Sequence, residues 1–80
     1  MKKTWYVEIA HVDPGFALIT GYVDTPEGIA DAYGVFLYLM YDDTGLPVNF
    51  VMLKNEEEDG VIAIRREDVS VVNIHQTSND

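Results

Sequence analysis

The chain has 80 residues, no cysteine, and fourteen acidic against five basic side chains, which gives a formal net charge of −9. This length predicts one domain, residues 1–80, and the lack of cysteine excludes disulfides and thiolate metal sites, so that self-association is the remaining way to supplement a small core. The charge excludes the broad basic surface on which non-specific nucleic-acid binding depends, so any nucleic-acid site must be small and local.

The N-terminal part predicts two strands joined by a tight turn. In residues 5–12 apolar and polar side chains alternate, as in a strand with one buried face. Residues 13–15 are Asp, Pro and Gly, which each favour a chain reversal, and residues 16–23 form the second predicted strand. Gly21 lies inside this second strand, where a glycine is typical of a bulge or of a bend at a barrel corner.

The N-terminal region carries no export signal that we recognise. Lys2 and Lys3 resemble the start of such a signal, but Glu8 and His11 interrupt the apolar segment that has to follow. No segment approaches the roughly 20 apolar residues that span a bilayer. We therefore expect a cytoplasmic protein without a membrane partner.

Residues 25–34 differ from the flanking strands. Thr25 can cap a helix, Pro26 suits the first helical position, and Gly34 can end the helix. This pattern predicts one or two helical turns. Gly28 disfavours a helix, so an ordered loop is the alternative.

Residues 35–41 and 48–53 are predicted as two further strands, joined by a turn at 42–47. Both runs are apolar on both faces, although a small barrel buries only one face of each strand. The second face therefore needs a cover, or it stays as a large exposed patch. We expect another copy of the chain to cover it, and the alternative is that residues 26–34 lie across it.

The last two predicted strands, 61–64 and 69–74, follow an acidic turn at 56–60. Only Arg65-Arg66-Glu67-Asp68 separates them, and without Gly or Pro this link predicts a sharp corner instead of a tight hairpin. Residues 75–80 are predicted to fray. The complete pattern predicts an all-β fold: a small, strongly bent, antiparallel barrel of five to six strands, with one short helix or ordered loop.

The sequence offers little catalytic or metal-binding chemistry. His11 and His75 lie in or beside strands, and no catalytic triad or Gly-rich phosphate loop is visible. Asp42 and Asp43 lie in a turn that lacks the spacing of a calcium loop. We predict a protein that is not an enzyme and uses no metal or cofactor.

Arg65 and Arg66 are the only paired basic residues outside the N-terminus. Arginine can grip a phosphate or stack on a base, and a ring of subunits would repeat the pair around its axis. The alternative is that both arginines only neutralise Glu67, Asp68 and the nearby acidic residues.

Residues 64–72, Ile-Arg-Arg-Glu-Asp-Val-Ser-Val-Val, resemble the second sequence motif of the Sm and Sm-like (LSm) family. The resemblance implies a bent five-stranded barrel that assembles into rings through its edge strands and binds single-stranded RNA near the pore. It places Arg65 at the RNA-contacting arginine and Asp68 at a polar position usually held by Asn, while Arg66 replaces the glycine of the family.

These observations give one leading hypothesis and two alternatives. The first is an Sm-like homo-oligomer, joined through strand edges and the apolar faces of 35–41 and 48–53, that binds single-stranded RNA or DNA with Arg65, Arg66 and Asp68. The second is an acidic interaction or inhibitor module that mimics nucleic acid, with Glu56, Glu57 and Glu58 in contact with a basic partner. The third is a structural subunit without a ligand.

Overall fold

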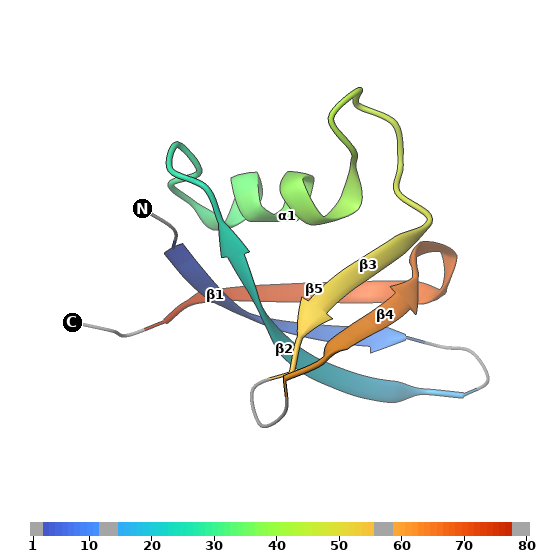
Figure 1. Cartoon of the computed structure of the whole chain (residues 1–80). Coiled ribbons are helices and arrows are strands. Elements are labelled where there is room, and N and C mark those ends of the chain that lie inside the picture. Colours follow the sequence, from blue (N-terminus) through green and yellow to red (C-terminus); the bar gives the residue numbers. More distant parts are fainter. Residues whose placement is uncertain (1–2, 12–14, 56–58, 78–80) are drawn as a thin grey trace.

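The computed structural model describes residues 3–11, 15–55 and 59–77. Five antiparallel strands form one sheet, and one short helix packs against it (Figure 1). The elements are β1 (Lys3–His11), β2 (Ala17–Thr25), α1 (Ala32–Met40), β3 (Phe50–Lys54), β4 (Val61–Arg65), the 3-10 turn η1 (Arg66–Asp68) and β5 (Val69–Gln76). The prediction of a small, mostly antiparallel β fold with one short helix is confirmed.

The strands lie in the order β4-β3-β2-β1-β5, so β4 and β5 are at opposite ends of the sheet. No described residue of β4 pairs with β5, and the sheet is not closed into a full barrel. Figure 1 shows β3 and β4 crossing over the layer that β1 and β5 form. The chain therefore curls around its core but keeps two free edges.

The strand β1 lies between β2 and β5 in the sheet. It pairs with β2 on one side, where Val7 is opposite Gly21, and with β5 on the other, where Val7 is opposite Ile74. Trp5, Val7 and Ile9 are buried, as the alternating pattern predicted. Burial of such side chains stabilises a fold by about 1.5–3 kcal/mol each, so β1 supplies a large share of the core.

Gly21 is the point where β3 passes close to β2. The register between β1 and β2 is continuous through Gly21, so the expected bulge is absent there. A Cβ atom on Gly21 would lie 2.9 Å from the Cβ of Leu53 and 2.9 Å from the carbonyl oxygen of Lys54. The glycine is therefore required by the close approach of a neighbouring backbone.

The prediction of a strand at 35–41 is wrong, because these residues belong mostly to α1. The carboxylate Oδ1 of Asp31 accepts a hydrogen bond of 2.9 Å from the Gly34 amide and caps the helix. The helix thus begins near the end of segment 25–34, where we expected a helix to stop. A short apolar run fits a buried helix as well as a buried strand, so its pattern did not decide between them.

Helix α1 covers the inner face of the sheet. Val35, Leu39 and Met40 are buried and join the core with residues of β1, β2, β3 and β4. This burial shows that one chain covers much of the apolar surface that we expected a second copy to cover. On the second apolar run, Phe50 and Met52 remain exposed while Val51 is fully buried.

The corner between β4 and β5 is sharp, as predicted. The single turn η1 links the two strands, and the backbone N–H of Arg66 donates a 3.0 Å hydrogen bond to the carbonyl oxygen of Asn49. His75 and Gln76, expected in a frayed tail, belong to β5. Residues 12–14, 56–58 and 78–80 lie outside the described residues, including most of the predicted first turn and the glutamates of the acidic cluster.

Candidate functional site

Of the three residues that the sequence singled out, the structure brings Arg65 and Asp68 into contact, whereas the side chain of Arg66 contacts the end of helix α1. The Nε of Arg65 donates a 3.0 Å hydrogen bond to Oδ2 of Asp68, and an NH group of Arg65 lies 3.4 Å from Oε2 of Glu67. The side chain of Arg65 is 52% exposed. Exposed pairs of this kind contribute about 0–1 kcal/mol, so an incoming phosphate can compete for Arg65.

Arg66 holds helix α1 against the corner. Its Nε donates a 3.1 Å hydrogen bond to the carbonyl oxygen of Met40, at the C-terminal end of α1. Its guanidinium also lies over the Tyr41 ring, 5.1 Å from the ring centre. A cation at a helix C-terminus is favourable, and so is a cation over an aromatic face. Arg66 therefore has a structural role whether or not it also binds a ligand.

A shallow hollow of about 450 Å³ opens beside these arginines, and we call it the corner hollow. Residues 47–50 and 65–67 line it, and Phe50 lies opposite Arg65 in the β3–β4 pairing. Phe50 is half exposed, and as the cross-strand partner of Arg65 it lies on the same face of the sheet as Arg65. The sequence analysis missed Phe50, although alternation in 48–53 would have placed it on the face opposite Val51.

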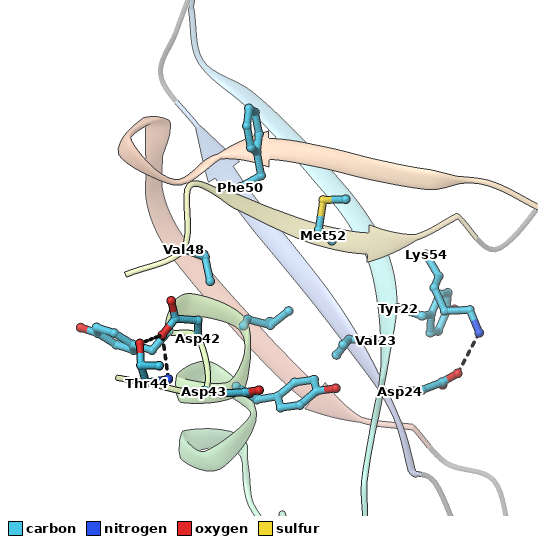
Figure 2. Close-up of a pocket in the computed structure, with 13 residues that line it drawn as sticks. Tyr22, Val23, Asp24, Asp42, Asp43, Thr44, Val48, Phe50, Met52 and Lys54 are labelled. Atoms are coloured by element: carbon cyan, nitrogen blue, oxygen red, sulfur yellow. Dashed lines mark hydrogen bonds and ion pairs between the residues drawn. The ribbon is translucent and has the colours of Figure 1, made fainter. Parts of the chain in front are cut away.

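A larger groove of about 820 Å³ lies between α1, β2 and β3, and we call it the α1 groove (Figure 2). It exists because β2 and β3 pair only at Tyr22 and Lys54 and then separate. Helix α1 and the loop at 42–48 fill part of the space between the two strands. No sequence pattern pointed to this groove, since it depends on the helix that we predicted as a strand.

Acidic side chains lie at both ends of the α1 groove. At one end Asp24 accepts hydrogen bonds from the Lys54 ammonium, at 2.8 Å, and from the Thr4 hydroxyl, at 2.7 Å. The hydrogen bond and the charge of Asp24 raise the pKa of Lys54 above 10.5, its usual value. At the other end lie Asp42 and Asp43, as Figure 2 shows.

Asp42 organises its loop. Its Oδ1 accepts hydrogen bonds from the Thr44 hydroxyl at 2.7 Å, the Thr44 amide at 2.9 Å and the Leu46 amide at 3.0 Å. The Thr44 hydroxyl, followed by the Leu46 amide, lowers the pKa of Asp42 below its usual 3.8. Asp42 therefore keeps its negative charge in mildly acidic solution.

The lowered pKa of Asp42 predicts a pH dependence of stability. The carboxyl group of Asp42 binds a proton less tightly in the folded protein than in the unfolded chain. The ionised carboxylate therefore stabilises the fold above pH 3.8, and this stabilisation is lost as the pH falls through the lowered pKa of the folded state. We expect Asp42→Asn to lose less stability than the wild type on acidification below about pH 4. Urea unfolding at several pH values measures this, and parallel curves for the two proteins would contradict it.

A row of rings crosses the outer face of the sheet. His75, Tyr6 and Tyr22 lie opposite one another on β5, β1 and β2, with ring centres 6.1 Å and 5.3 Å apart. The Nε2 atom of His75 also lies 3.2 Å from Oε1 of Glu8. The rings pack on one another, which gives cross-strand stabilisation of about 0.2–1 kcal/mol per pair.

The described residues contain no group of three or more acidic or histidine side chains that could hold a metal ion. Within the same residues, no helix has both the length and the apolar character needed to cross a membrane. Comparison of the chain with protein-family models, with curated proteins and with solved structures finds no match in any of the three.

Proposed function

We propose that the protein is a non-catalytic, self-associating β subunit of the cytoplasm that binds single-stranded nucleic acid at the corner hollow. The proposal includes a relationship to the Sm and Sm-like family, which rests on residues 64–72 of the sequence. The observation that carries the binding site is that the half-exposed side chains of Phe50 and Arg65, which are cross-strand partners, line the same hollow.

The open edges of the sheet support self-association. The outer edges of β4 and β5 have no partner strand in the described part of the chain, and they lie at opposite ends of the sheet. Unpaired edges readily add another strand. Pairing of β4 in one copy with β5 in the next is a heterologous contact, and repetition of this contact closes a ring when the rotation allows it. The exposed Val61 and Val71 lie on these two strands.

The chemistry of the corner hollow supports a nucleic-acid ligand. Bases of every sequence stack on an exposed aromatic ring, and stacking contributes about 1–3 kcal/mol per base. Arg65 can bind the neighbouring phosphate through two parallel N–H groups. Asp68 fixes the direction of the Arg65 side chain through its 3.0 Å hydrogen bond, so we assign Asp68 a positioning role. Arg66 lines the same hollow from the helix side.

Because the chain carries a net charge of −9, we expect nucleic acid to bind at a small site that is repeated on each subunit of the assembly. A single corner attracts phosphate with one or two guanidiniums, while the remainder of the molecule repels it. Several corners on one assembly act on one strand of nucleic acid, so that the second contact occurs at a high effective concentration. Self-association and nucleic-acid binding are therefore expected to occur together.

We expect Phe50→Ala to weaken binding of a labelled oligouridine about fivefold to a hundredfold, the range that corresponds to the loss of one stacked base. Arg65→Ala is expected to weaken binding and to reduce the salt dependence by about one phosphate contact. Fluorescence anisotropy at several salt concentrations measures both effects. Lys54→Gln is the matched control because it removes a positive charge outside the corner hollow, and its binding should stay close to that of the wild type.

Sedimentation of the purified protein tests the assembly. A mass of several copies at micromolar concentration is expected, and a Lys substitution at Val71 on β5 should reduce it, since a charge on an edge strand opposes edge pairing. A monomer at every concentration would refute self-association. An assembly that binds no oligouridine, or a Phe50→Ala variant that binds as the wild type does, would refute the nucleic-acid site.

A further inference from the structure

The α1 groove, of which the proposed function uses only the shared residue Phe50, has the composition of a site for a positively charged ligand. Its lining contains three aspartates and one lysine. That lysine, Lys54, is already paired with Asp24 at 2.8 Å. Asp43 forms no hydrogen bond or ion pair with the described residues, so its charge is available. A phosphate or another anion would be repelled here, whereas a cation would be attracted.

The walls of the α1 groove are apolar and aromatic. Tyr38 on α1 and Phe50 and Met52 on β3 are exposed along it. Lysine and arginine pack their aliphatic stems on apolar surface of this kind, and their charged ends are favourable over the face of an aromatic ring. Met52 adds a flexible side chain that adapts to different neighbours. The groove therefore suits a ligand with apolar stems and cationic ends better than it suits a bare metal ion.

The sheet edge beside the α1 groove suits an extended chain. From Phe50 to Met52, the side of β3 that faces β2 pairs with no strand of the described chain, because β2 approaches β3 only at Leu53 and Lys54. An extended peptide can add to an open sheet edge through its backbone, with alternate side chains directed to the two sides. An acidic groove along such an edge places those alternate side chains near carboxylates.

Tyr38 and Asp43 lie at a junction between two hollows. Together with Tyr41 and Asp42 they line the α1 groove and also a neighbouring hollow of about 560 Å³. Figure 2 shows Asp43 extending from its loop toward the groove. A cationic side chain at this junction is close to two carboxylates and an exposed tyrosine ring. This junction is the position at which recognition of the charge should be strongest.

From these observations we infer that the α1 groove binds an extended, basic segment of a partner protein, with a lysine or arginine at the junction of Tyr38, Asp42 and Asp43. The α1 groove shares Phe50 with the corner hollow, but the inference uses neither Arg65 nor the sheet edges that self-association would occupy, so it can be tested separately. In this inference the aspartates of the α1 groove recognise the basic side chains of the partner.

The experiment uses the full chain and two fluorescent peptides, one alternating lysine with valine and the other alternating glutamate with valine. We expect the lysine peptide to bind and the glutamate peptide not to bind. Asp43→Asn should weaken binding about fivefold, and Asp43→Asn combined with Tyr38→Ala about twentyfold, because both side chains are exposed and each contact is modest. Chemical-shift changes in NMR spectra should map to α1, β3 and the loop at 42–46.

Two matched variants separate recognition from a general effect of charge. Glu67→Gln removes the same charge as Asp43→Asn but lies outside the α1 groove, and Arg65→Ala disables the proposed nucleic-acid site. Both should bind the lysine peptide as the wild type does. The inference is overturned if the lysine peptide fails to bind, if Glu67→Gln weakens binding as much as Asp43→Asn, or if the NMR changes fall outside the groove.

Discussion

Replacement of Leu39 by alanine is expected to lower the free energy of unfolding by about 2–5 kcal/mol. Leu39 is 6% exposed and belongs to the core cluster, so the substitution removes apolar contacts and leaves a cavity beneath α1. Domains of this size are stable by only about 5–15 kcal/mol. The variant should therefore unfold at a much lower urea concentration, as followed by circular dichroism.

The matched control is Leu37→Ala. Leu37 is 38% exposed, and it lies two residues from Leu39. In a strand, residues two apart share a face, whereas on a helix they lie on different sides. The structure therefore predicts a small effect at Leu37, within about 0.5–1 kcal/mol. Equal destabilisation by the two substitutions would contradict the helix and favour the strand that the sequence pattern predicted.

Gly21→Ala is expected to destabilise the protein by about 1–3 kcal/mol, although alanine adds only one methyl group. The new Cβ would lie 2.9 Å from the backbone oxygen of Lys54, which is fixed by its place in β3 and cannot move aside as a flexible side chain would. Relief of the clash requires separation of β2 from β3. That separation should also widen the α1 groove, which begins at the same crossing.

Urea unfolding of Gly21→Ala, next to Gly60→Ala as a control, tests this explanation. Gly60 has no heavy atom within 4 Å of the position that a Cβ would take. Its replacement should leave the unfolding midpoint nearly unchanged, or raise it slightly through a less flexible unfolded chain. If Gly21→Ala were as stable as Gly60→Ala, the close approach between β2 and β3 would not exist in solution.

Most of the fold could be predicted from the sequence, because all five observed strands overlap runs that the sequence predicted as strands, at 5–12, 16–23, 48–53, 61–64 and 69–74. Residues 5–12 alternate between apolar and polar side chains, and 61–64 and 69–74 are rich in β-branched residues. The run at 35–41 carries no such pattern, since nearly every position is apolar. Its helical state depends on the Asp31 cap and on an open space over the sheet, and only the first of these is local in the sequence.

The candidate sites could be predicted only where their residues are neighbours in the chain. Arg65, Arg66 and Asp68 lie within one turn, so the sequence alone was enough to group them. The hydrogen bond from Arg66 to the carbonyl oxygen of Met40 could not be predicted from the sequence, because it depends on where α1 ends. The α1 groove combines β2, α1 and β3, whose relative positions no local pattern specifies.

The pairing of β1 with β5 has a consequence for how the protein is made. Strand β1 leaves the ribosome before the other strands of this sheet, yet one of its two partners is β5, which follows all of them, with Trp5 opposite Gln76. The nascent polypeptide therefore cannot complete the pairing of β1 until residue 76 has been translated. Contacts so distant along the chain slow folding to the range of milliseconds to seconds. During synthesis this edge of β1 therefore stays unpaired and open to pairing with other strands until β5 has emerged.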